Sequence, residues 1–124
     1  MSARKYLVLF VVLALSAILI AACTPSTSTG GSSGSTTITV SDDLKFTPNV
    51  INAKPGQAVE VVVDNSAGKT DHTFIVKDLK VNEQIPAGKK TTVKFTAPAA
   101  GTYTFECDLP GHKEAGMIGQ IVVK

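Results

Sequence analysis

Three side chains that can bind a soft metal ion lie close together near the C-terminus of the 124-residue chain: Cys107, His112 and Met117. Four residues separate Cys107 from His112, and four more separate His112 from Met117. The Pro110-Gly111 pair between them predicts a tight loop rather than a helix. A loop of this kind can gather a thiolate, an imidazole and a thioether around one point.

Sulfur ligands combined with imidazole favour copper over magnesium or calcium. Two histidines and one cysteine in a plane, with a weak axial methionine, form the ligand set of blue-copper electron-transfer sites. The loop holds only one histidine, and the chain has one other, His72. Strand alternation places His72 on the same inward face as Phe74. We therefore expect a metal site made of His72, Cys107, His112 and Met117.

The same stretch resembles the copper loop of the cupredoxins, the type 1 blue copper proteins of the plastocyanin, azurin and auracyanin kind. The resemblance rests on the patterns Gly101-x-Tyr103-x-Phe105-x-Cys107, Pro110-Gly111-His112 and Gly116-Met117-x-Gly119. His72 looks like the upstream histidine of that family, with Thr73 at the position where many members have asparagine. The resemblance covers residues 36–124, which is most of the chain.

This resemblance implies a Greek-key β-sandwich that binds one copper ion and alternates between Cu(I) and Cu(II). It implies that Cys107 is the thiolate ligand, that His72 and His112 complete the plane, and that Met117 is the weak axial ligand. It further implies a monomer that carries electrons and is not an enzyme. Its partners would be redox proteins at a membrane surface, such as cytochromes or oxidase complexes.

The resemblance also implies that the ring edge of His112 reaches the surface. Its neighbours Leu109, Pro110, Gly111 and Ala115 are apolar, although loops usually expose polar residues. A small apolar patch suits the weak, brief docking of redox partners. The alternative is that Leu109 packs into the core, as leucine often does.

The chain from Thr36 onward has the period-two alternation of short β-strands. Apolar residues alternate with polar ones in five segments, at 38–40, 59–63, 72–76, 93–95 and 103–107, and again at 121–123. Pro-Gly, Ala-Gly and Asn-Ser turns separate them, and no long segment has the helical period. The pattern predicts an all-β sandwich in which Phe105 and Cys107 point inward.

Residues 1–22 resemble the signal peptide of a bacterial lipoprotein. Arg4 and Lys5 precede an apolar run that ends in Ala21-Ala22-Cys23, which resembles a lipobox. We expect cleavage before Cys23, lipid on Cys23, and a flexible Ser/Thr/Gly linker over residues 23–35. The alternative is an uncleaved membrane helix. Both interpretations hold the domain outside the cytoplasm, in the periplasm or on the outer face of the cell membrane.

The charge and the rare residues narrow the function further. The formal net charge of +2 comes from Arg4 and Lys5, because the remaining ten lysines balance ten acidic residues. A near-neutral domain without a basic face argues against nucleic-acid binding. Cys23 lies in the N-terminal segment, so we expect no disulfide between it and Cys107. Cys107 is then a free thiol that can bind a metal ion.

Several alternatives stay open at this point. Taken singly, Cys107 could be an inert buried thiol, His112 a surface residue and Met117 core filler. A Cys–His hydrolase would need a third, orienting group, and a multi-site copper enzyme would need more histidines. A copper-binding or chaperone lipoprotein without electron transfer is the main competitor. Zinc also accepts thiolate and imidazole ligands.

Overall fold

The computed structural model describes residues 34–124, which form nine strands and one short 3-10 helix. In chain order the elements are β1 (Gly34–Ser41), β2 (Lys45–Thr47), β3 (Val50–Ala53), β4 (Ala58–Asp64), β5 (His72–Val76), η1 (Lys77–Leu79), β6 (Val81–Ile85), β7 (Lys90–Thr96), β8 (Gly101–Glu106) and β9 (Ile118–Val123). Within this range no helix is long and apolar enough to cross a membrane. The predicted signal peptide and nearly all of the predicted linker lie outside the described residues.

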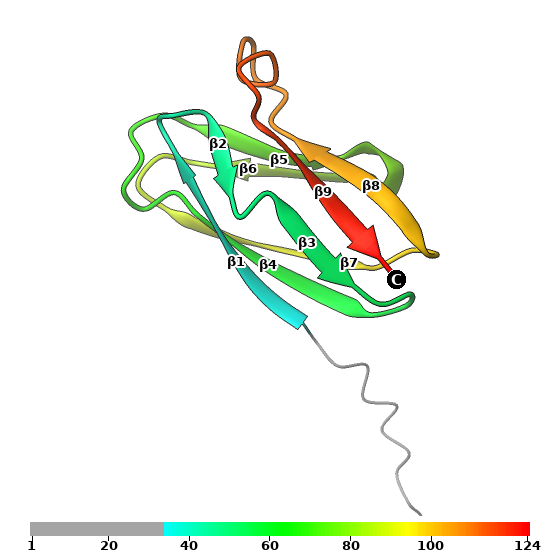
Figure 1. Cartoon of the computed structure of the whole chain (residues 1–124). Coiled ribbons are helices and arrows are strands. Elements are labelled where there is room, and N and C mark those ends of the chain that lie inside the picture. The colour runs from blue at the N-terminus through cyan, green and yellow to red at the C-terminus, as the bar shows by residue number, and fades with distance from the viewer. Residues whose placement is uncertain (1–33) are drawn as a thin grey trace, which may run out of the picture.

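The strands form two sheets that face each other (Figure 1). One sheet has the order β2-β1-β4-β7, and the other has the order β3-β9-β8-β5-β6. Two pairings are parallel, β1 with β4 and β3 with β9, and the other pairings are antiparallel. The prediction of an all-β sandwich is confirmed.

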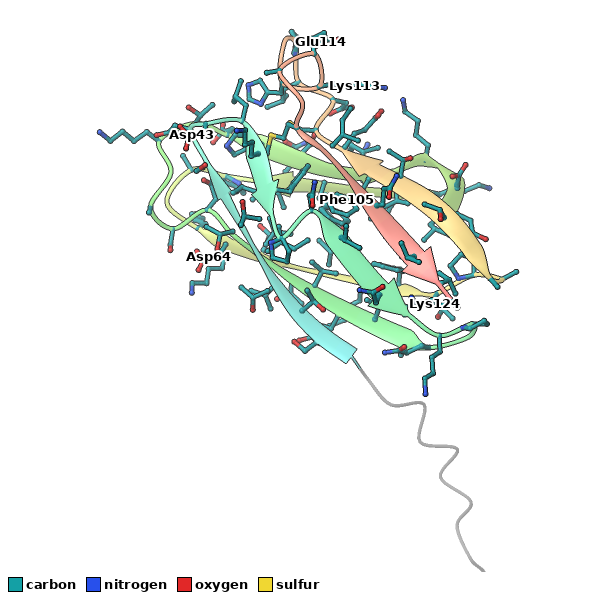
Figure 2. All side chains as sticks on the ribbon, in the orientation of Figure 1. Asp43, Asp64, Phe105, Lys113, Glu114 and Lys124 are labelled. Atoms are coloured by element: carbon teal, nitrogen blue, oxygen red, sulfur yellow. The ribbon has the colours of Figure 1, made fainter. Side chains whose placement is uncertain are left out.

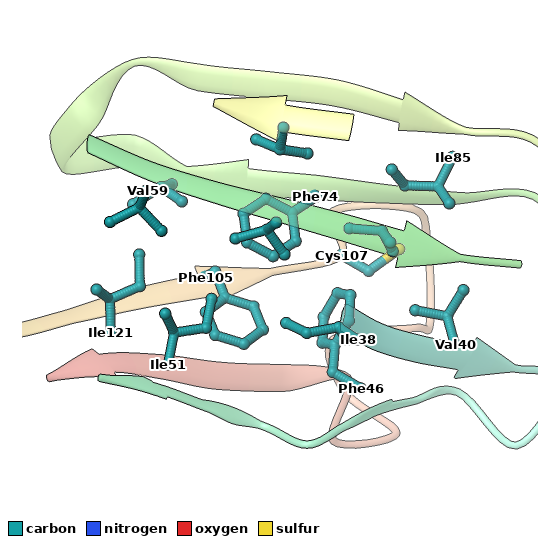
Figure 3. Close-up of a cluster of buried hydrophobic side chains, with 14 of the residues drawn as sticks. Ile38, Val40, Phe46, Ile51, Val59, Phe74, Ile85, Phe105, Cys107 and Ile121 are labelled. Carbon is teal, nitrogen blue, oxygen red and sulfur yellow. The ribbon is translucent and has the colours of Figure 1, made fainter. Parts of the chain in front are cut away.

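The core lies between the sheets and is built from the inward side chains of alternating strands (Figure 3). Three phenylalanines meet at its centre. Phe105 stacks on Phe74 with ring centroids 4.8 Å apart, and Phe46 meets Phe105 edge-on at 5.0 Å. Each fully buried phenylalanine contributes about 1.5–3 kcal/mol to folding. Cys107 is fully buried at one end of this cluster, so its predicted inward direction is confirmed.

The structure differs from the predicted strand pattern in two ways. Strand β1 begins at Gly34, two residues before the predicted domain boundary, because Gly34 and Ser35 pair with Val59 and Glu60 of β4. The short strands β2, β3 and β6 were not predicted. Most of β6 is exposed and polar, so it lacks alternation and is a strand only because it pairs with β5 along its whole length.

The two ends of the sandwich carry different parts of the chain (Figure 1). The loop between β8 and β9 projects from one end and contains His112. Strand β1 begins at the opposite end, so the segment before Gly34 joins the domain far from that loop. Figure 2 shows Lys113 and Glu114 on the projecting loop and Lys124 near the other end.

Candidate metal centre

Two of the predicted site residues are fixed by strands. Cys107 directly follows β8 and has no exposed surface. His72 is the first residue of β5, pairs with Ile85 of β6, and is also fully buried. Backbone pairing on these strands therefore holds both residues at the same end of the sandwich.

The third residue comes from the loop between β8 and β9. His112 lies in a series of tight turns in which its amide donates to the carbonyl of Leu109 at 3.1 Å. Gly111 and Gly116 have positive φ angles of 82° and 96°, which suit glycine and allow the loop to fold back. His112 is half-buried, unlike the fully buried His72 and Cys107.

The structure brings His72, Cys107 and His112 together although the first and the last are 40 positions apart in the sequence. Nδ1 of His72 lies 3.3 Å from Nδ1 of His112, and Sγ of Cys107 lies 3.4 Å from Nδ1 of His112. One ligand atom from each residue lies within 4.8 Å of the others. Atoms that share one metal ion at about 2.0–2.3 Å must be this close. The spacing of the three donors therefore fits a single small metal ion.

The protonation of His72 also suits a ligand. Burial lowers the pKa of His72, and the nearby His112 lowers it further, while Asp42 and Asp71 act in the opposite direction. Nε2 of His72 is buried and has no hydrogen-bond partner among the described residues. A neutral ring with its proton on Nε2 leaves the Nδ1 lone pair directed at the other two donors. Neutral imidazole is the form that binds a metal ion.

Thr73 contacts the sulfur of Cys107, and Asp108 contacts Thr73. The Thr73 amide donates to Sγ at 3.4 Å. The Thr73 hydroxyl lies 3.6 Å from Sγ but only 2.7 Å from Oδ1 of Asp108, whose amide donates back to Oγ1 at 3.0 Å. A hydroxyl has one proton, and the shorter contact to a carboxylate is the stronger one. The sulfur therefore accepts its hydrogen bond from the backbone amide of Thr73 and not from the Thr73 hydroxyl.

Met117 lies at the base of the loop and is fully buried. Its amide donates to the carbonyl of His112 at 3.0 Å, and its carbonyl accepts the amide of Cys107 at 3.1 Å. Two backbone hydrogen bonds thus tie Met117 to His112 and Cys107. Its role as the axial ligand stays a prediction.

The predicted apolar surround of His112 is partly exposed. Pro110, Gly111 and Ala115 are exposed, whereas Leu109 is half-buried and packs against the core. Leu109 therefore contributes to packing, and its carbonyl accepts the His112 amide.

Sequence reasoning missed one buried charge at the site. Glu106 precedes Cys107, and its side chain is only 7% exposed. Its carboxylate binds both Lys77 and Lys113, and these lysines hold its pKa below the ordinary value against the effect of burial. Strand alternation places Glu106 on the outward face, which is why the pattern gave no sign that it is buried.

A comparison with known protein families shows which family the chain belongs to. The cupredoxin-like domain matches residues 10–123, which is nearly the whole chain. The chain is a cupredoxin. With this fold, His72, Cys107 and His112 are positioned to bind one copper ion.

Individual relatives of this cupredoxin include two kinds of copper protein. It is 29% identical over 107 residues to the copper-resistant cuproprotein CopI of Rubrivivax gelatinosus, covering 70% of this chain and 64% of the relative. It is 39% identical over 71 residues to rusticyanin of Acidithiobacillus ferrooxidans, covering 56% of this chain and 33% of that protein. The chain thus spans less than two thirds of either relative.

Among solved structures, the fold is similar to that of reduced auracyanin from Roseiflexus castenholzii. The TM-score is 0.66 at 22% sequence identity, covering 74% of this chain and 98% of auracyanin. At this identity the likeness shows the fold alone.

Proposed function

We propose that this cupredoxin is a mononuclear type 1 copper protein that carries single electrons outside the cytoplasm. The observation that supports this most is the convergence of His72, Cys107 and His112 within 4.8 Å. A copper ion bound by one thiolate and two imidazoles supplies a one-electron couple between Cu(I) and Cu(II). The chain's part is to hold these donors in one arrangement and to exclude water.

The way the donors are held supports electron transfer rather than catalysis. His72 and Cys107 are anchored by strand pairing and are fully buried, so neither has room to move when charge changes. Only His112 is partly exposed. We therefore expect an electron to enter and leave through His112, the one donor of the three that solvent or a partner can reach.

The similarity to CopI favours a second candidate, a protein that binds copper for resistance without carrying electrons. Two measurements distinguish these functions: the rate of electron exchange between copies and the rate of copper removal. We expect mixed Cu(I) and Cu(II) protein to exchange electrons between copies, seen as broadening of NMR lines, while a Cu(I) chelator removes copper slowly. Slow electron exchange together with rapid copper transfer would support the resistance function instead.

We propose Met117 as the axial ligand, because it is buried and its backbone is hydrogen-bonded to His112 and Cys107. Met117→Leu removes a weak donor that favours Cu(II), so the reduction potential should rise while the colour persists. Met117→Gln should lower the potential. A tenfold change in relative affinity is about 59 mV for one electron, and we expect shifts of at least about that size by voltammetry. Unchanged potentials in both variants would make Met117 a packing residue only.

We also propose that the domain is tethered outside the cytoplasm through lipid on Cys23. The segment before Gly34 joins the end of the sandwich opposite the His112 loop (Figure 1). A tether there would leave the loop facing away from the membrane, accessible to redox partners such as cytochromes or oxidase complexes. Protein from the membrane fraction should lack residues 1–22 and carry acyl mass on Cys23, and intact mass spectrometry tests this. Recovery with Met1 intact would favour an uncleaved membrane helix.

A further inference from the structure

Glu106 is a buried carboxylate at the end of β8, next to the metal site. Its side chain is 7% exposed, although glutamate is almost never buried unless it is paired. Each of its oxygens binds a different lysine. Oε1 lies 2.6 Å from Nζ of Lys77, and Oε2 lies 2.7 Å from Nζ of Lys113.

The two lysines come from the segments that hold the two histidines. Lys77 begins η1, immediately after β5, the strand that starts at His72. Lys113 follows His112 in the loop between β8 and β9 (Figure 2). Glu106 itself precedes Cys107. One carboxylate thus connects the three segments that carry the three converging ligands.

The loop has few other polar attachments to the fold. Residues 109–116 are joined mainly to one another, for example by the bond from the Ala115 amide to the Gly111 carbonyl at 3.1 Å. Among the described residues, the Lys113–Glu106 pair is the only side-chain hydrogen bond or ion pair from this segment to the sandwich apart from the contacts of His112. Apart from the packing of Leu109 and the backbone bonds at its base, the loop therefore depends on the Lys113–Glu106 pair when no metal holds His112.

We propose that Glu106 is a positioning residue that holds the His112 loop against β8 through Lys113, whether or not copper is bound. This rests on the proposed function, since it explains how His112 stays near Cys107 and His72 in both oxidation states. A loop held by the protein has less to rearrange when an electron arrives or leaves. Lys77 lies between β5 and β6, which already pair with each other. The Lys77–Glu106 ion pair is therefore not needed to hold its segment in place.

Lys77 supplies the matched control. Lys113→Met and Lys77→Met each remove one cation from the same carboxylate and leave it one partner. Lys113 is 45% exposed and Lys77 is 70% exposed, so solvent weakens both bridges. We expect Lys113→Met, but not Lys77→Met, to free the loop, and Lys113→Arg to keep it closed. Glu106→Gln should resemble Lys113→Met.

Amide hydrogen exchange in the metal-free full chain measures the loop directly. The amides of Ala115 and Met117 both make hydrogen bonds in the closed loop. In Lys113→Met they should exchange roughly five to ten times faster than in wild type, and in Lys77→Met within about twofold of it. In copper-loaded protein, a Cu(I) chelator should remove the metal faster from Lys113→Met by a similar factor.

Equal exchange rates in the Lys113 and Lys77 variants would overturn the proposal, and so would wild-type protection in Lys113→Met and Glu106→Gln. The metal-free measurement involves no electron transfer. If the loop opens as expected but copies exchange no electrons, the proposed function fails and the role of Glu106 stands. If electrons exchange at the wild-type rate and the loop stays protected in every variant, only the role of Glu106 fails.

Discussion

Cys107→Ser should abolish the intense blue or blue-green colour that we expect from the copper-loaded protein. The colour requires a thiolate bound to Cu(II), and Cys107 is the only cysteine among the three converging ligands. A serine hydroxyl at this buried position offers no sulfur orbital to the metal. We expect the visible absorption to fall at least tenfold and the EPR spectrum to lose its blue-copper character. The wild-type colour should bleach on reduction.

The second cysteine provides the control for this experiment. Cys23→Ser keeps Cys107 and should keep the full colour, because residue 23 precedes the domain. The type 1 assignment would be wrong if the wild-type protein bound copper and stayed nearly colourless. It would also be wrong if Cys107→Ser kept the colour.

Leu109→Glu should slow electron exchange between two copies of the protein by at least tenfold. Leu109 is half-buried and lies three positions before His112 in the same loop, and in self-exchange both faces would carry the new carboxylate. Like charges brought together at an interface cost several kcal/mol, and about 1.4 kcal/mol is a factor of ten. The rate follows from NMR line broadening in mixed oxidation states. Because Leu109 also packs against the core, some loss of stability should accompany the change.

A second pair of variants separates docking from packing. Ala115→Glu and Ala58→Glu introduce the same charge at exposed alanines, one on the loop and one at the start of β4 near the opposite end. Neither alanine is part of the core. Exchange should slow in Ala115→Glu and stay at the wild-type rate in Ala58→Glu, with unchanged visible spectra in both. If Leu109→Glu and Ala115→Glu exchange electrons at the wild-type rate, His112 and its surround are not the electron port.

One hydrogen bond and one ion pair near the site also affect how tightly copper is held. Thr73 and Asp108 bond to each other across 35 residues of sequence, and Glu106 binds Lys113 of the loop. Both pairs attach the strand of one ligand to the segment that carries another. Contacts of this kind reduce the rearrangement that metal binding requires.

Local features of the sequence were enough to predict the loop and the fold class. The spacing of Cys107, His112 and Met117 is a property of one short segment, so it needs no knowledge of the fold. Alternation around Phe105 correctly placed Cys107 on the inward face, because side chains in a strand point to opposite faces in turn. His72 was found because the chain has no other histidine outside the loop.

Only the tertiary structure decided which distant residues serve the site. A period of two shows which face of a strand is apolar, but it does not show which strands are neighbours or what covers the outer face. Glu106 therefore looked like a solvent-exposed residue, yet Lys77 and Lys113 bury and pair it. Strand β6 is polar in sequence and exists because β5 offers it a hydrogen-bonding edge. These contacts depend on pairing between segments far apart in the chain. The ligand spacing of the loop, by contrast, depends only on the order of residues within one short segment.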